Sequence, residues 1–283
     1  MKPIDIYISS SHDVYKNIAL EEFLLTSSKQ DILLFYINKD AVVIGKHQNP
    51  WIEVDLSPSR DFKIIRRLSG GGTVFHDLGN INFSFLRNKE TDFVNFKEHI
   101  IPISKTLEQL NIPNSISERN DLFVDEYKVS GNAEHVNSSL KRLLHHGTLL
   151  YDSNLVKLNG SIKPKEALNI KTHAVPSKRS PVSNLRNFYD WGSTETFLEL
   201  IVQKLKIIID VNSVQEIDPS NMTEITNLVN EKYALDEWNF NHTPQFKYTG
   251  KSGEIYKIRK GKVIESKNSN EIGLPFKKIL EHD

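Results

Sequence analysis

The sequence predicts an α+β protein built around a mixed β-sheet. Short segments rich in β-branched and aromatic residues, such as 32–37, read as buried strands. Other segments, such as 193–209, carry apolar residues at helical spacing. The two kinds of segment alternate irregularly, which favours a mixed sheet over a regular βαβ winding. The length of 283 residues allows one large domain or two smaller ones.

In the first third of the chain, Asp13 can cap a helix whose apolar stripe includes Val14, Ile18 and Phe23. Only a short turn separates 32–37 from 41–44, so these two strands are expected to pair as a hairpin. The strands expected in this part of the chain are 4–8, 32–37, 41–44, 63–67 and 80–86.

The middle of the chain mixes both kinds of element. Residues 94–110 have helical spacing, although Pro102 is expected to kink or split that helix. Short strands are expected at 122–124 and 127–130, joined by an acidic turn, and one or two strands at 140–151.

The remaining segments are a long loop, a helix and a small β unit. The loop covers 159–187, with some helix at 164–168, and the helix covers 193–209. A hairpin or meander is expected at 246–266, where the composition shifts. We therefore predict a domain of residues 1–240 followed by a short segment of 241–283.

Composition excludes several classes of function. The chain has no cysteine, so disulfide scaffolds, zinc ribbons and thiolate nucleophiles are not available to it. The 36 basic and 36 acidic residues balance, so neither a nucleic-acid nor a membrane partner is expected. The N-terminus lacks the patterns of a signal or transit peptide, which favours the cytosol, or the mitochondrion in a eukaryote.

The most informative stretch is RRLSGGGTVFHD at 66–77. Three successive glycines between two strands let the backbone approach a ligand closely, and their N–H groups can point at an anion. Arg66 and Arg67 lead into the glycines and offer charge-assisted hydrogen bonds to the same anion. A plain flexible connection is the alternative interpretation.

A second stretch, NDLFVDEYKVSGNA at 120–133, places Lys128 after a tight turn. If its strand packs against the glycine loop, Lys128 would bring a cation to a bound phosphoryl or carboxylate oxygen. Asp121 could hold a metal or a ribose, or could simply cap a turn. Farther on, His145 and His146 are adjacent on a predicted strand and must face opposite sides, so the two cannot share one metal ion.

Taken in order, these motifs resemble the lipoate–protein ligase family. The matching segments are VVIGKHQNPW, RRLSGGGTVFHDLGNINFSF, NDLFVDEYKVSGNA, HHGTLL, RSPVSNL and EWNF. The resemblance covers residues 5–245 and implies the α+β catalytic fold shared by lipoate and biotin ligases. It also implies an enzyme that uses ATP, with Mg²⁺, to convert lipoate to lipoyl-AMP. The lipoyl group then passes to a lysine of a lipoyl domain of a dehydrogenase E2 subunit, or of a glycine-cleavage H protein.

The resemblance also implies roles for individual residues. Lys128 is the catalytic residue, Asp121 is the candidate Mg²⁺ ligand, and Tyr36 and Gly45 belong to the lipoyl tunnel. The segment around Arg179–Leu185 resembles a loop that closes over the adenylate. The residues expected to bind the lipoyl adenylate are Arg67, Ser69, Gly70, Gly71, Gly72, Val74, Phe75, His76, Asn82, Asn120, Asp121, Ser130, Gly131, Ala133, His146 and Arg179.

Many members of the family carry a C-terminal accessory domain that is tied to adenylation. Here about 40 residues follow Trp238, so a reduced accessory segment is expected. This leaves two alternatives open: a complete ligase, or a lipoyltransferase that uses pre-formed lipoyl-AMP or needs a separate accessory protein. Octanoyl transfer through an enzyme thioester is disfavoured, because it requires a cysteine.

Overall fold

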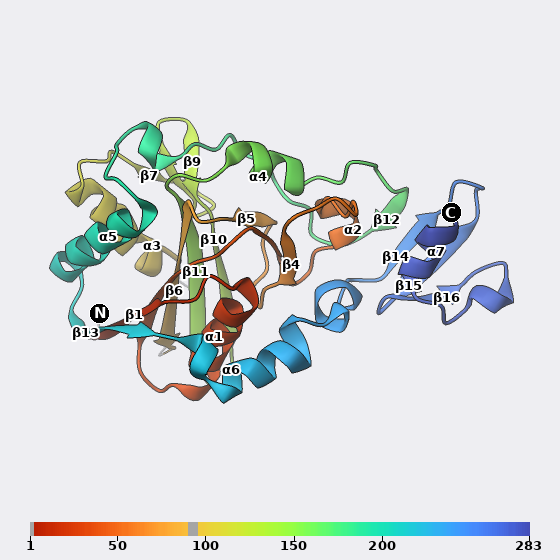
Figure 1. The fold of residues 1–283 in the computed structure, drawn as a ribbon, viewed down its shortest axis with the longest axis horizontal. Coiled ribbons are helices and arrows are strands. Elements are labelled where there is room, and N and C mark those ends of the chain that lie inside the picture. Colours follow the sequence, from red (N-terminus) through yellow and green to blue (C-terminus); the bar gives the residue numbers. More distant parts are fainter. Residues whose placement is uncertain (1–2, 90–95) are drawn as a thin grey trace.

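The computed structural model describes residues 3–89 and 96–283. Its centre is a six-stranded mixed sheet in the order β10-β11-β6-β2-β1-β13 (Figure 1). Strand β1 pairs in parallel with its two neighbours, and β6 pairs antiparallel with β2 and β11. These strands are β1 (Ile4–Ser9), β2 (Ile32–Ile37), β6 (Asn80–Asn88), β10 (Asn132–Asn137), β11 (Arg142–Leu150) and β13 (Val211–Ile217). The predicted α+β mixed-sheet class is confirmed.

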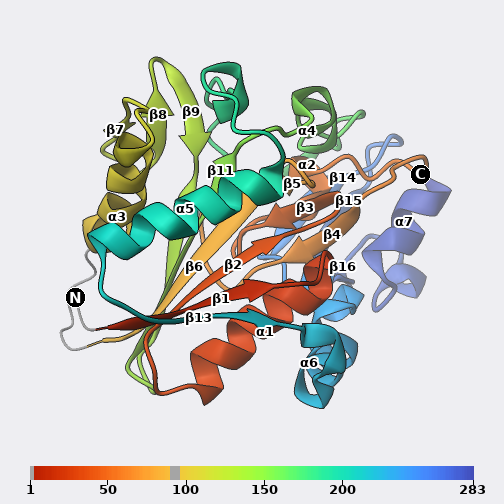
Figure 2. The same ribbon diagram turned by 60° about the vertical axis from the view of Figure 1, so that its left-hand side comes forward.

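Helices cover both faces of this sheet (Figure 2). In β2, Leu33 and Phe35 face the side packed by α3 (Phe96–Gln109) and α5 (Thr194–Ile208). The alternate residues Leu34 and Tyr36 face α1 (Val14–Ser27). A strand buried on both faces reads as a continuous apolar run, which is why 32–37 shows no polar alternation.

Three of the expected helices, α1, α3 and α5, form within small differences in their bounds. The Asp13 carboxylate accepts hydrogen bonds from the N–H groups of Tyr15 and Lys16 and caps α1. Pro102 lies inside α3 without splitting it; the predicted residues 94–95 lie outside the described residues. Within the described ranges, no helix has the length and apolarity needed to span a membrane.

One predicted hairpin is wrong. Strand β3 (Ala41–Ile44) does not pair with β2, but forms a second sheet in the order β4-β3-β5, with β4 (Lys63–Arg66) and β5 (Val74–His76). Both edges of β2 are already taken by β1 and β6. The buried Asn38, bonded to Asn17, fixes the chain where it leaves the central sheet.

A third sheet, β7-β8-β9, stands at one end of the molecule. It consists of β7 (Ser115–Ile116), β8 (Leu122–Val124) and β9 (Tyr127–Ser130). The turn joining β8 and β9 contains Asp125 at a φ of 51°, a left-handed conformation that Asp tolerates better than most residues. The predicted hairpin at 122–130 is confirmed.

The helix expected at 164–168 is absent, and the helical turn lies earlier, at α4 (Leu155–Ser161). The side chain of Asn154 accepts a hydrogen bond from the Lys157 N–H and begins that helix. Pro164 disfavours helical backbone in the residue before it, which separates α4 from the segment that follows.

The C-terminal part forms a fourth sheet, in the order β12-β14-β15-β16 (Figure 1). The predicted meander corresponds to β14 (Phe246–Thr249), β15 (Ile255–Arg259) and β16 (Lys262–Glu265), followed by α7 (Phe276–His282). Its edge strand, β12 (Ile170–Thr172), comes from the part of the chain before residue 240. The segments 1–240 and 241–283 therefore share one sheet, while the boundary itself stays a prediction.

Candidate active site

Two adjoining cavities lie beside the glycine-rich connection between β4 and β5. The first reaches inward to the apolar side chains of Ile18, Tyr36 and Val43. The second is walled by the apolar side chains of Phe75, Leu150, Leu158, Ile162 and Val182. The residues that line both are Thr73, Val74, Lys128, Gly131, Thr148, Ser177 and Lys178. Lys128 therefore stands where the two cavities meet.

The glycine loop passes very close to the end of β3. A Cβ atom added to Gly45 would lie 2.1 Å from the carbonyl oxygen of Gly71, so only glycine fits there. Gly71 itself has a φ of 83°, which favours glycine. Gly71 and Gly72 line the first cavity, while a Cβ added to Gly70 would meet nothing within 4 Å.

The two arginines that precede this loop have different roles. Arg67 is buried, donates to the carbonyl oxygens of Val43, Gly70 and Gly72, and lines the first cavity. Its guanidinium therefore holds the loop in shape, and it keeps its charge because burial lowers its pKa only to about 10.

Arg66 does not reach the site, contrary to the prediction. Successive residues of a strand point to opposite faces, so Arg66 is buried on the other side of β4. There it donates to the carbonyl oxygens of Gln48 and Asn239, at 2.8 and 2.9 Å, and ties the chain near residue 240 to the end of β3.

Lys128 forms an ion pair with Asp121 inside the cavity. The Lys128 Nζ lies 2.9 Å from the Asp121 Oδ1, and the lysine side chain is 21% exposed. Gly131 leaves room for this arrangement, because a Cβ there would come within 3.1 Å of the Nζ. The pair joins the start of β8 to β9 and leaves the ammonium facing both cavities.

A buried polar chain runs from the first cavity into the core. The His146 Nε2 lies 2.5 Å from the Ser69 Oγ, and its Nδ1 lies 3.0 Å from the Glu21 Oε1. Burial alone would raise the pKa of Glu21, but His146 and the Ser84 hydroxyl outweigh burial and lower it. The ionised Glu21 therefore orients the His146 ring against the loop that carries Ser69.

His76 is a neutral histidine at the same wall. Its Nδ1 lies 2.9 Å from the Asn38 Nδ2 and accepts that hydrogen bond in the neutral ring. Burial, together with the charges of Arg67 and His146, lowers the pKa of His76 from 6.5 to about 3.

The lowered pKa of His76 predicts that acid decreases the stability of the folded chain. The unfolded chain protonates His76 near its ordinary pKa of 6.5, whereas the folded chain does so only near 3. As the pH falls through this window, the free energy of unfolding should decrease by about 1.4 kcal/mol per pH unit from this residue, with no effect above about pH 7. Urea denaturation at pH 7.5, 6.0 and 5.0 measures the slope. His76→Gln should flatten it, and an unchanged slope in that variant would contradict the assignment.

A segment after β12 lies over the glycine loop. The Ser177 Oγ accepts from the Thr73 N–H at 3.0 Å and from the Gln48 Nε2 at 2.9 Å. Val182 forms a parallel bridge with Lys128, and Arg179 lines the second cavity. The segment predicted to cover the adenylate, around Arg179–Leu185, therefore lies against Lys128, and Ser177 just before it lies against the glycine loop.

Most of the predicted site residues converge on these cavities. Ser69, Gly70, Ser130 and Gly45 support the walls from behind, and Asn120 holds Asn132 through its carbonyl oxygen. The predicted residues that line a cavity are Tyr36, Arg67, Gly71, Gly72, Val74, Phe75, His76, Asn82, Asp121, Lys128, Gly131, Ala133, His146 and Arg179.

Sequence reasoning missed several residues of the site. Glu21 comes from the first helix, far away in sequence from the motifs, and no local pattern marks it. Arg119 and Lys178 are exposed cations at the rim, with nothing in their local pattern to mark them. The segment 42–51 contained a usable signal, because Gln48 accepts from the Gly45 N–H and the Thr73 hydroxyl.

Comparison with known proteins defines the class. Residues 13–206 match the family model described as the lipoyl protein ligase A/B catalytic domain. The chain is 34% identical over 269 residues to lipoate–protein ligase LplJ of Bacillus subtilis, covering 89% of this chain and 80% of that one. It is 33% identical over 252 residues to lipoate–protein ligase 1 of Staphylococcus aureus, covering 86% of this chain and 75% of that one. The chain belongs to the lipoate–protein ligase family.

Solved structures show the same fold. LipL1 of P. falciparum, in complex with lipoate, superposes with a TM-score of 0.70 at 23% identity, covering 92% of this chain and 82% of that one. A lipoate–protein ligase A bound with ATP gives a TM-score of 0.70 at 24% identity, covering 84% of this chain and 98% of that one. The fold of the predicted lipoate-ligase type is therefore confirmed.

Proposed function

We propose that this chain is an ATP-dependent lipoate–protein ligase that makes lipoyl-AMP and transfers the lipoyl group to one lysine of an acceptor protein. The observation that carries the proposal is the position of Lys128, between a cavity with an apolar inner end and a second apolar cavity. The first would take the lipoyl chain and the second the adenine. The carboxylate and the α-phosphate would then meet at the Lys128 ammonium.

The first step brings two anions together. A lipoate carboxylate oxygen attacks the α-phosphorus of ATP, the bond to the β-phosphate oxygen breaks, and pyrophosphate leaves. The Lys128 ammonium offsets the repulsion and stabilises the charge that develops on the α-phosphoryl oxygens. The N–H groups of the loop, held in shape by Arg67, are the neutral donors at this place.

Asp121 fits a role as the protein ligand of Mg²⁺. Its carboxylate is the acidic side chain among the described residues that line the cavities, and it lies against Lys128. Mg²⁺ commonly binds through one or two carboxylates together with substrate phosphates. When bound, the ion would neutralise phosphate charge.

The second step is aminolysis of the mixed anhydride. The neutral amine of the acceptor lysine attacks the acyl carbon, the carbon–oxygen bond to AMP breaks, and the amine loses one proton. Lys128 would stabilise the departing phosphate oxygen. Because the anhydride hydrolyses easily, the segment 177–182 has the position needed to exclude water from it.

The acceptor would be an E2 lipoyl domain or a glycine-cleavage H protein. One structural relative is described as a bi-partite lipoate protein ligase with its E2 lipoyl domain, from Thermoplasma acidophilum. That description supports a lipoyl-domain acceptor and also the possibility of a separate accessory protein.

The test combines the pure chain with lipoate, Mg-ATP and an apo lipoyl domain. We expect pyrophosphate release and, by mass spectrometry, one lipoyl addition to the acceptor. The matched control is an acceptor whose target lysine is replaced by arginine, and octanoate as a competing acid measures chain preference. If pre-formed lipoyl-AMP is consumed while lipoate and ATP give no product, the chain is a lipoyltransferase and the ligase proposal fails.

A further inference from the structure

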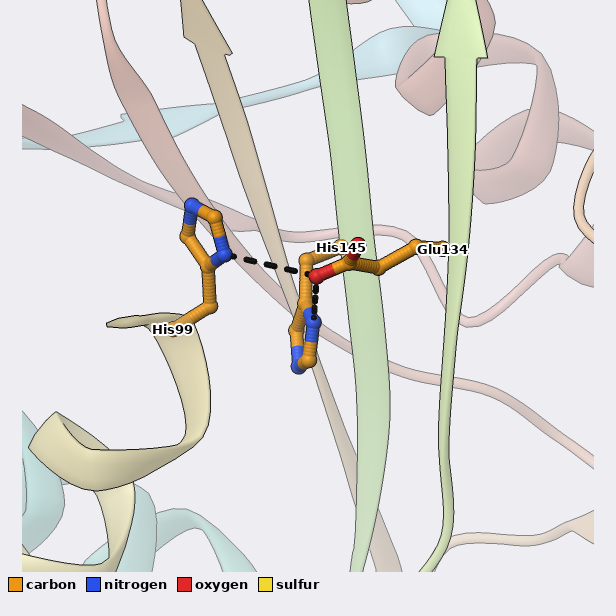
Figure 3. Close-up of side chains that lie close together, drawn as sticks. All are labelled: His99, Glu134 and His145. Carbon is orange, nitrogen blue, oxygen red and sulfur yellow. Dashed lines mark hydrogen bonds and ion pairs between the residues drawn. The ribbon is translucent and has the colours of Figure 1, made fainter. Parts of the chain in front are cut away.

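A second group of polar side chains lies outside the active site, between α3 and the central sheet (Figure 3). It consists of His99 from α3, Glu134 from β10 and His145 from β11, and we refer to it as the His-Glu-His cluster. Glu134 and His145 are directly opposed in the β10–β11 ladder, so both side chains point to the α3 face. His146 points to the other face, toward the first cavity.

The three side chains converge on one point. The His145 Nδ1 lies 2.8 Å and the His99 Nδ1 3.5 Å from the same oxygen, the Glu134 Oε1 (Figure 3). One potential ligand atom from each residue lies within 4.8 Å of the others. Ligand atoms of a small tetrahedral ion are separated by roughly 3 to 3.5 Å when the bonds are about 2.0 to 2.1 Å long.

Burial makes this convergence unusual. The side chains of His99, Glu134 and His145 are 6%, 3% and 0% exposed. Among the described residues, the His99 Nδ1 and the Glu134 Oε2 have no hydrogen-bond partner. Polar atoms that are buried without a partner carry a desolvation cost, so a bonding partner for them is expected.

The hydrogen bonds around His145 are compatible with a metal ligand. The Asn132 Nδ2 donates to the Asn120 carbonyl oxygen, which turns the Asn132 Oδ1 toward the His145 Nε2 at 3.3 Å. The His145 Nδ1 lies 2.8 Å from the Glu134 Oε1, so the single proton of a neutral ring lies either on Nδ1, toward the carboxylate, or on Nε2, toward Asn132. An ion bound at Nδ1 would leave the Nε2 proton to the Asn132 oxygen.

The Glu134 carboxylate faces both imidazoles, so the cluster presents the nitrogen and oxygen ligands that a divalent transition-metal ion takes from proteins. A neutral imidazole with an ionised carboxylate is the form in which both groups bind metal ions.

We propose that His99, Glu134 and His145 form a structural binding site for a divalent transition-metal ion, with Zn²⁺ as the ion to test. Two imidazoles disfavour the hard ions Mg²⁺ and Ca²⁺, which select oxygen ligands. The Glu134 Oε2 can supply a fourth donor atom beside the three on the cluster. With the ion at the His145 Nδ1, the Nε2 N–H would donate to the Asn132 Oδ1 as an outer partner.

The role of the ion would be structural because none of the three side chains lines either active-site cavity. The aromatic rings of Phe83 and Phe85 lie beside His145, and Phe85 also contacts His99. Bound there, the ion would fasten α3 to the β10–β11 pair. That pair carries Ala133 and His146 on its other face, in the wall of the first cavity.

The first measurement uses the full chain without lipoate or ATP. The protein is stripped with EDTA, dialysed and titrated with ZnCl₂ or CoCl₂. We expect about one Zn²⁺ per chain by elemental analysis, a higher melting temperature with Zn²⁺, and a visible Co²⁺ absorption band of four-coordinate type. X-ray absorption of the Zn²⁺ form should indicate two imidazole ligands. A stripped protein that takes up no Zn²⁺, or binds it through no histidine, would overturn the proposal.

Substitutions within the His-Glu-His cluster test whether Zn²⁺ binds there. His99→Gln and Glu134→Gln should each weaken Zn²⁺ binding by more than about 100-fold and abolish the change in melting temperature. The control His282→Gln removes an exposed histidine at the chain end, and Asp121→Asn removes the proposed Mg²⁺ ligand; both should bind Zn²⁺ like the wild type. Undiminished binding by folded His99→Gln would refute the site. If that variant does not fold, the proposal is decided by the number of imidazole ligands that X-ray absorption finds on Zn²⁺ in the wild type.

Discussion

Replacement of Lys128 by alanine is expected to lower the rate of lipoylation by about 100- to 1,000-fold, as removal of one cation or donor at the developing charge does in other enzymes. The Lys128 Nζ lies where the two cavities meet and is held there by Asp121 at 2.9 Å. Without it, the carboxylate and the α-phosphate would meet with less compensating charge. Pyrophosphate release measures the first step, and acceptor mass measures the second.

The matched control is Lys247→Ala, which removes an exposed lysine from another short strand, β14. This variant should retain the wild-type rate. Circular dichroism should show that both variants are folded, since Lys128 is partly exposed and carries little of the core. A folded Lys128→Ala variant that lipoylates the acceptor at the normal rate would remove Lys128 from the mechanism.

The second large effect is expected from Gly45→Ala. The new Cβ would lie 2.1 Å from the Gly71 carbonyl oxygen, a backbone atom that cannot rotate away. The loop must shift, and a displacement near 1 Å can cost about 100-fold in rate. We expect a loss of that size in kcat/KM. Overpacking should also lower the free energy of unfolding by about 1 to 3 kcal/mol, measurable by urea denaturation.

Gly70→Ala is the control within the same loop. A Cβ at Gly70 meets nothing within 4 Å, and the substitution keeps the backbone N–H. Both variants add one methyl group, so the difference between them isolates the close approach of β3 to the loop. Equal activities in the two variants would show that the loop tolerates displacement.

Local patterns predicted those elements that are determined by their own residues. The cap at Asp13, the helix of α5 and the turn at Asp125 depend on neighbours in sequence, and each was predicted. The pairing of β3 depends instead on which edges β1 and β6 leave open, which no local pattern contains. Strand β13 at Val211–Ile217 was missed because its alternation is largely polar and exposed.

The helical turns after residue 222 were also missed. They contact α1 through Lys232, whose Nζ lies 2.7 Å from Glu22. Ile225 and Tyr233 of the same segment are buried in the core beside α1, a long-range contact that no local pattern predicts.

The residues of the candidate site divide in the same way, between those that a local pattern predicts and those that only the folded chain brings together. The residues of the glycine loop and of the KVSG motif were found because each motif is continuous in sequence and resembles a known family. Glu21 and Arg119 were missed because only the folded chain brings them to the cavity. Arg66 was placed on the wrong side because its charge was considered without the alternation of the strand that carries it. The His-Glu-His cluster depends on α3 crossing the strand pair, so no spacing in the sequence could predict it.

The parallel pairing of β1 with β13 also constrains the order of folding. Residues 4–9 pair on their outer side with residues 211–217, so the central sheet cannot be completed until residue 217 has left the ribosome. Closing so long a loop is entropically expensive, and contacts of high sequence separation slow folding. Until then β1 presents an unpaired edge, which makes the nascent chain vulnerable to intermolecular strand pairing during synthesis.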